Sequence, residues 1–198
     1  MSKFLLLLGP SGAGKSTIIH ELRDLDSRFI YISPYITRPL REGEKDKISI
    51  TDEVMDTMDG KGEFLIINNL YDIRYATPRL PIIEAMEQKN FPILDWPISK
   101  MDIMTQAFPE DLLTVYIAPP TIEELRHRIK KDGRDTDGSR FRDAKAELKR
   151  YWAGEFDNYC DLKIVNQTGQ TIEISQKIYS IYLKSTGEGN KPSKEQKA

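Results

Sequence analysis

Residues 9–17 read Gly9-Pro10-Ser11-Gly12-Ala13-Gly14-Lys15-Ser16-Thr17, and this stretch decides how the rest of the chain is interpreted. It matches the phosphate-binding loop pattern G-x-x-x-x-G-K-[ST] at every fixed position. The apolar run from Phe4 to Leu8 precedes it, which is typical of a strand buried on both faces. After the loop, Ile18, Ile19 and Leu22 recur at helical spacing, so the predicted order is strand, glycine-rich loop, helix.

The residue types in this loop suit a nucleoside triphosphate. Glycines let the backbone turn so that successive N–H groups point at phosphate oxygens, and the following helix adds its positive dipole end. We expect Lys15 to reach the β- and γ-phosphates and the Ser16 hydroxyl to ligate Mg²⁺. The residues expected to contact ATP are Gly9, Ser11, Gly12, Ala13, Gly14, Lys15, Ser16 and Thr17. The simpler interpretation, a glycine turn with a surface lysine, leaves the flanking strand and helix unexplained.

Composition narrows the class of protein. The 198 residues can bury one substantial core, and a net charge of −2 gives no electrostatic footprint for nucleic acid. Cys160 is the sole cysteine, so no intrachain disulfide is possible and a cytoplasmic location is expected. The N-terminal apolar run spans only five residues, Phe4 to Leu8, so we expect neither a signal peptide nor a membrane span.

Strand-like and helix-like segments alternate along the chain. This order predicts an α/β fold with a central parallel sheet and helices on both faces. The segment from Tyr71 to Arg79 is polar and is expected to be a loop. Expected strands are 4–8, 29–33, 64–67, 91–95, 112–117 and 161–165, and expected helices include 15–25, 80–88, 139–152 and 171–183.

Two further features each leave two interpretations open. Arg38 and Arg41 lie in a polar, turn-rich segment, where they are either solvated charges or, near a phosphate loop, bidentate phosphate ligands. Asp95 ends an apolar run, where it either approaches Mg²⁺ or caps a turn.

The charged segment from Lys130 to Arg142 contains two glycines and lies between two predicted helices. It is either a mobile lid that brings arginines onto the triphosphate or a solvated helix connection.

Taken together, these segments resemble the guanylate kinase family over roughly residues 2–183. Beyond the phosphate loop, the matching pieces follow the family's order. They are Thr37-Arg38-Pro39-Leu40-Arg41-Glu42-Gly43-Glu44, Gly62-Glu63-Phe64-Leu65, Tyr75-Ala76-Thr77-Pro78-Arg79, Pro92-Ile93-Leu94-Asp95, Ile117 to Leu125, and Lys163-Ile164-Val165-Asn166.

The resemblance implies roles for particular residues. Arg38, Arg41, Tyr75 and Thr77 would bind the acceptor nucleotide, and Arg134 and Arg140 would be lid arginines. Asn166 would lie by the donor's adenine, and Asp95 with Ser16 would hold Mg²⁺. Catalysis would then consist of in-line positioning and charge neutralisation by Lys15, Arg38, Arg134, Arg140 and Mg²⁺, without a protein nucleophile.

It also implies a single domain over 1–183. The core would comprise 1–33 and 91–183, with an acceptor-binding insertion at 34–90 and a lid at about 130–142. The polar residues 184–198 are expected to form a disordered tail.

The departures from the family pattern lie at the positions with which the family recognises guanine. Ile66 replaces a glutamate, Pro97 replaces the second acid of L-D-x-D, and Pro34 replaces a serine. The segment 45–50 is shortened and lacks the tyrosine usually found there. Losing several polar partners should weaken or abolish guanine selection, unless Asn68, Asn69 or Asp72 substitutes for them.

The sequence is consistent with three functions. The first is an ATP- and Mg²⁺-dependent kinase of a small phosphate monoester, with GMP favoured by family analogy. The second is a ribose 1,5-bisphosphate phosphokinase, which 35–38 and 48–50 also resemble, although the Tyr75 to Arg79 match argues against it. The third is a kinase-like binding module that has lost transfer. The expected partner is a small-molecule phosphate acceptor, with no nucleic acid or membrane, in a monomer or homodimer.

Overall fold

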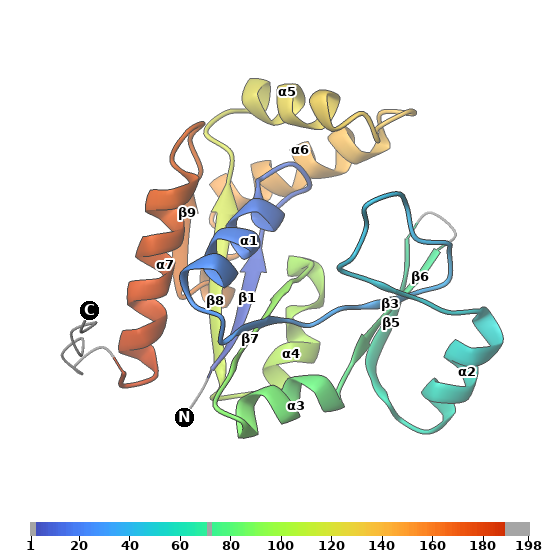
Figure 1. Cartoon of the computed structure of the whole chain (residues 1–198). Helices are drawn as coiled ribbons and strands as arrows, with labels where there is room; N and C mark the ends of the chain where they lie inside the picture. Colours follow the sequence, from blue (N-terminus) through green and yellow to red (C-terminus); the bar gives the residue numbers. More distant parts are fainter. Residues whose placement is uncertain (1–2, 71–72, 189–198) are drawn as a thin grey trace.

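The computed structural model describes residues 3–70 and 73–188 and places two sheets side by side (Figure 1). The larger sheet has five parallel strands in the order β2-β7-β1-β8-β9. Their bounds are Phe29–Tyr31 (β2), Phe91–Asp95 (β7), Phe4–Leu8 (β1), Leu112–Ala118 (β8) and Leu162–Val165 (β9). The predicted parallel α/β sheet is confirmed.

Helices cover both faces of this sheet. Leu5 and Leu7 of β1 pack in one cluster with α1 and α7, whereas Phe4, Leu6 and Leu8 pack in the other with α3, α4, α5 and α6. Burial on both faces explains why β1 is uninterruptedly apolar. The bounds are Lys15–Leu25 (α1), Leu80–Glu87 (α3), Met101–Ala107 (α4), Ile122–Asp132 (α5), Ser139–Trp152 (α6) and Thr171–Ser185 (α7), with short 3₁₀ turns at Ile98–Lys100 and Asp157–Tyr159.

The smaller sheet carries β4 (Ile48–Ser49), β3 (Tyr35–Ile36), β6 (Ile73–Pro78) and β5 (Phe64–Leu70) in that order, and α2 (Asp52–Gly60) packs beside it. The expected loop over 71–79 is wrong, because β6 runs antiparallel to β5 through most of it. Tertiary pairing overrides the polar composition of this segment. Residues 71 and 72 lie outside the described residues.

The insertion and the tail differ in detail from the expected boundaries. Ile82 of α3 packs in the larger core cluster, although it lies within the expected 34–90 insertion. Helix α7 continues to Ser185, and Glu188 pairs with Arg28 at 2.7 Å, so the expected start of the tail at 184 is too early. Residues 189–198 lie outside the described residues. Within the described part of the chain, no helix has the length and apolar character needed to cross a membrane.

The first glycine of the loop lies against strand β8, the neighbour of the central strand β1. Gly9 has φ +126°, and a Cβ there would lie 2.1 Å from the carbonyl oxygen of Ile117. Because that oxygen belongs to the backbone of β8, the contact cannot be relieved by a side-chain rotation. Only glycine lets β1 turn into the loop at this point.

We predict that Gly9→Ala lowers the free energy of unfolding by about 2–4 kcal/mol, because it adds a backbone clash to an unfavourable φ. Chemical denaturation measures the loss. Gly169→Ala is the matched control, since Gly169 also has a positive φ, +87°, but a Cβ there meets nothing within 4 Å. The control should lose about 1–2 kcal/mol. Equal losses in both variants would contradict the proposed clash.

Candidate phosphate-transfer site

The phosphate loop connects β1 to α1 and folds around its own lysine. The Lys15 Nζ donates to the carbonyl oxygens of Gly9 at 2.6 Å and Pro10 at 3.1 Å. Burial lowers the pKa of Lys15, and the carboxylates of Asp95 and Glu147 oppose that shift. The predicted ligands Ser16 and Thr17 follow in the exposed first turn of α1. The Lys15 ammonium is therefore held inside the loop by backbone carbonyl oxygens.

Asn166 supports the loop from the end of β9. Its side-chain amide donates to the Ala13 carbonyl oxygen at 2.8 Å, and its backbone N–H donates to the Ala118 carbonyl at 2.7 Å. Its side chain is buried, and a Cβ at Gly14 would lie 2.4 Å from the same amide nitrogen. Its contact with the loop backbone is a structural finding, whereas its expected place beside adenine stays a prediction.

Arg128 of α5 is a second support that sequence reasoning missed. Its guanidinium donates to the Asn166 carbonyl oxygen at 2.9 Å and to the Ala13 carbonyl oxygen at 3.4 Å. It also pairs with Glu124 at 2.8 Å. The i,i+4 spacing of Glu124 and Arg128 was the available signal, but such spacing also occurs on ordinary solvated helix faces.

The two predicted lid arginines share one carboxylate. Asp132 Oδ2 accepts from Arg134 Nε at 2.7 Å and from Arg140 Nη1 at 2.8 Å. Arg140 also donates to the Ser11 hydroxyl of the phosphate loop at 2.6 Å, whereas Arg134 is about half exposed. The first turn of α6 therefore contacts the phosphate loop through Arg140.

Asp95 lies at the carboxyl end of β7, beside the phosphate loop. Strands β1 and β7 align Leu7 with Asp95, and the Tyr31 hydroxyl donates to Asp95 at 2.9 Å. Burial, followed by the Asp95 charge, raises the pKa of Tyr31, so this tyrosine stays a donor. The Asp95 carboxylate at this strand end offers the kind of hard oxygen ligand that Mg²⁺ prefers.

Glu147 is a partly buried acid that the sequence reasoning did not single out. It accepts a hydrogen bond from the Tyr116 hydroxyl at 3.1 Å, and burial raises the pKa of its carboxyl group. Tyr116 is itself stacked on Tyr151 with ring centroids 4.4 Å apart. Glu147 follows Arg140 by seven residues, two helical turns, so both lie on one side of α6. This seven-residue spacing from a predicted lid arginine is the feature of the sequence that could have drawn attention to Glu147.

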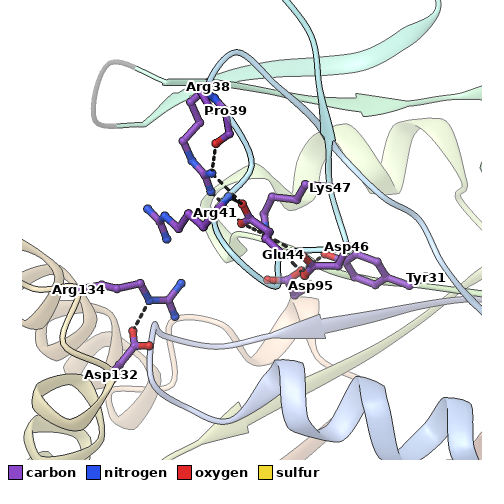
Figure 2. Close-up of polar contacts among 10 residues, drawn as sticks. All are labelled: Tyr31, Arg38, Pro39, Arg41, Glu44, Asp46, Lys47, Asp95, Asp132 and Arg134. Carbon is purple, nitrogen blue, oxygen red and sulfur yellow. Dashed lines mark hydrogen bonds and ion pairs between the residues drawn. The ribbon is translucent and has the colours of Figure 1, made fainter.

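The predicted acceptor arginines lie on the loop between β3 and β4 (Figure 2). The Arg38 guanidinium binds the Glu44 carboxylate through two nitrogens, at 2.7 and 2.8 Å. These bonds hold the pKa of Glu44 well below its usual range. Glu44 also accepts from the Arg41 backbone N–H at 3.1 Å, while the Arg41 side chain extends away from this carboxylate (Figure 2).

One face of the smaller sheet continues this cluster. Strands β5 and β6 pair Ile66 with Thr77 and Asn68 with Tyr75, so these four side chains share a face. Ile66 packs against the larger core cluster, and Tyr75 contributes to raising the pKa of Arg38, after Glu44. Asn69 pairs with Arg74 on the opposite face, next to α2. Of the two asparagines considered as guanine readers, only Asn68 lies on the face of the predicted acceptor residues.

The family model for guanylate kinase matches residues 1–175. The chain belongs to the guanylate kinase family. It is therefore a nucleoside monophosphate kinase with a phosphate-binding loop. The guanylate kinase of Clostridioides difficile is 34% identical over 152 residues, 73% of each chain. That of Nostoc sp. is 31% identical over 170 residues, 83% of this chain and 82% of the relative.

Solved structures show the same fold. A guanylate kinase from Anaplasma phagocytophilum superposes with a TM-score of 0.71 at 21% identity, covering 96% of this chain and 87% of that chain. A shikimate kinase from Acinetobacter baumannii superposes with a TM-score of 0.52 at 14% identity, covering 93% of this chain and 94% of that chain. At these identities the likeness concerns the fold alone.

We predict that Asn166→Asp destabilises the loop, because a carboxylate would face the Ala13 carbonyl oxygen that now accepts a hydrogen bond. A buried mismatch of this kind costs about 1–3 kcal/mol. That cost corresponds to a melting temperature lower by about 2–4 °C for each kcal/mol. Asn158→Asp is the control, since Asn158 is exposed. Calorimetry with and without MgATP measures both variants, and a melting temperature unchanged by Asn166→Asp would refute the role of this amide.

Proposed function

We propose that this chain transfers the γ-phosphoryl group of MgATP to a small phosphate monoester, and that a nucleoside monophosphate, with GMP first, is the acceptor. The observation that carries the proposal is that Tyr31 connects Asp95, beside the phosphate loop, with the loop of residues 37–47 (the acceptor loop), which carries Arg38 and Arg41. Asp95 contributes to the pKa of Lys15 on the donor side. Tyr31, its hydrogen-bond partner, also lies near Asp46 of the acceptor loop.

The reaction needs two polyanions to approach each other in line. An oxygen of the acceptor phosphate attacks the γ-phosphorus, and the bond to the β-bridging oxygen breaks, so that ADP leaves. The protein contributes positioning and charge neutralisation rather than covalent chemistry. In this scheme Lys15 and Arg140 stabilise the donor and the transferring group, and Arg38 and Arg41 hold the acceptor phosphate. Arg134 approaches from the lid.

Ser16 and Asp95 would hold Mg²⁺ together with phosphate oxygens, and the ion would neutralise charge on the triphosphate. Mg²⁺ in kinase sites is usually bound by one or two carboxylates plus substrate phosphates.

GMP is proposed because the named relatives are guanylate kinases. The side chains on the acceptor face argue for weak guanine selection, since Ile66, Asn68 and Thr77 include no carboxylate. The lack of a charged base reader favours ribose 1,5-bisphosphate as the second candidate acceptor. A binding module without transfer is the third reading, and the retained Lys15 and lid arginines oppose it.

A coupled ADP-release assay separates these functions. It should be run across GMP, dGMP, AMP, CMP, UMP and ribose 1,5-bisphosphate with MgATP. Turnover with any nucleoside monophosphate supports the proposal, and preference for ribose 1,5-bisphosphate replaces it with the second candidate. No turnover with any acceptor, together with tight binding of a protein partner, would overturn the enzyme function.

We predict that Lys15→Ala lowers kcat at least about a hundredfold, because a preorganised cation is removed from the transferring phosphate. The assay is ADP release with the best acceptor. Lys177→Ala makes the same change at an exposed position of α7 and should leave turnover within about twofold. Equal activity of the two variants would remove Lys15 from the proposed mechanism.

We predict that Ile66→Glu raises kcat/KM for GMP about tenfold or more relative to AMP, because a carboxylate would face the guanine N–H groups. Asn69→Glu is the matched control, since it adds the same charge to the opposite face of the same strand. It should leave the GMP to AMP ratio unchanged. An unaltered ratio in Ile66→Glu would show that this position does not line the base site.

A further inference from the structure

Lys47 belongs to the group of charged residues around Glu44 and Arg38, the acceptor cluster. In the sequence it lies among other charged residues and looks like an ordinary surface lysine. Its ammonium is 3.2 Å from Glu44 Oε1 and 3.3 Å from Asp46 Oδ1, and its side chain is 21% exposed. Lys45, two residues earlier on the same loop, is exposed. The fold therefore selects one of two nearby lysines and turns it inward.

The Glu44 carboxylate brings Lys47 next to Arg38. The same carboxylate accepts two hydrogen bonds from the Arg38 guanidinium and forms an ion pair with Lys47 (Figure 2). Two side-chain cations, Arg38 and Lys47, thus share the Glu44 carboxylate, and the Lys47 ammonium also contacts Asp46, its neighbour in the sequence. The Arg38 Nε is buried and has no partner among the described residues. Buried cationic donors with remaining capacity form a site for an anion.

We propose that Lys47 is a third cationic ligand of the acceptor phosphate, beside Arg38 and Arg41, and that it makes this kinase depend on a dianionic phosphate monoester more than on the base. A phosphate monoester carries about 1.5 to 2 negative charges at pH 7. An ammonium on a flexible stem suits such a target as a point charge, complementing the planar fork of Arg38. The inference rests on the proposed function.

The neutral face of the smaller sheet supports the same assignment. Ile66, Asn68 and Thr77 offer an aliphatic group, an amide and a hydroxyl, none of which carries a charge. The charged groups near the acceptor are instead on the loop that carries Arg38, Arg41, Glu44 and Lys47. Binding energy for the acceptor is therefore concentrated at its phosphate.

The test compares Lys47→Met with Lys45→Met. The second variant makes the same change at an exposed position of the same loop. We expect Lys47→Met to raise the acceptor KM about tenfold to a hundredfold, with the ATP KM and kcat at saturating acceptor within about threefold. Lys47→Arg, which keeps the charge, should recover most of the affinity. Lys45→Met should match the unaltered protein.

A structural role would give a different pattern. If Lys47 only supported the loop, Lys47→Met would lower kcat and the melting temperature together, and Lys47→Arg would not restore the acceptor KM selectively. An acceptor KM that is the same in Lys47→Met and Lys45→Met would overturn the proposal while leaving the kinase function intact.

If the unaltered protein turns over no acceptor, the proposed function fails and Lys47 is tested by binding alone. Calorimetric titration with GMP and with ribose 5-phosphate then gives the dissociation constants. Weaker binding of both ligands in Lys47→Met than in Lys45→Met supports the phosphate role, and equal binding rejects it.

Discussion

The arrangement of the site depends on how closely the phosphate loop is packed against the strands behind it. Gly9 leaves no room for a side chain beside the Ile117 carbonyl of β8. On the next strand, Asn166 holds the Ala13 carbonyl oxygen, and Arg128 ties the same two residues to α5. The phosphate-binding loop is thus held against the core of the larger sheet by close backbone packing and by two side-chain contacts.

Much of the donor half could be predicted from the sequence because its signals are local. The fixed spacing of the glycines, Lys15 and Ser16 and the unbroken apolar β1 are each contained in a few consecutive residues. Helix α6 was bounded correctly as Ser139–Trp152 by its amphipathic pattern. The contacts that hold this half together were not predictable, because Asn166 and Arg128 reach the loop from distant parts of the chain.

The acceptor half was harder to predict. The segment containing Tyr75 and Thr77 looked like a loop, because its polar residues carry no clear alternation until its pairing with β5 is known. The register of that pairing then separates Asn68 from Asn69, which the sequence left equivalent. Lys47 was likewise equivalent to Lys45, since only the fold of the loop around Glu44 distinguishes an inward from an outward lysine.

In both the donor half and the acceptor half of the site, arginines are already paired with carboxylates. Asp132 holds the lid arginines, and Glu44 holds Arg38. In the proposed reaction, ligand binding is then an exchange of anions, in which a phosphate replaces a carboxylate already in contact with the guanidinium. The arginines are partly desolvated before the substrate arrives, and a singly charged anion such as chloride gains little by displacing a tethered carboxylate of the same charge. The resting protein would therefore discriminate among the small anions of its surroundings by charge density.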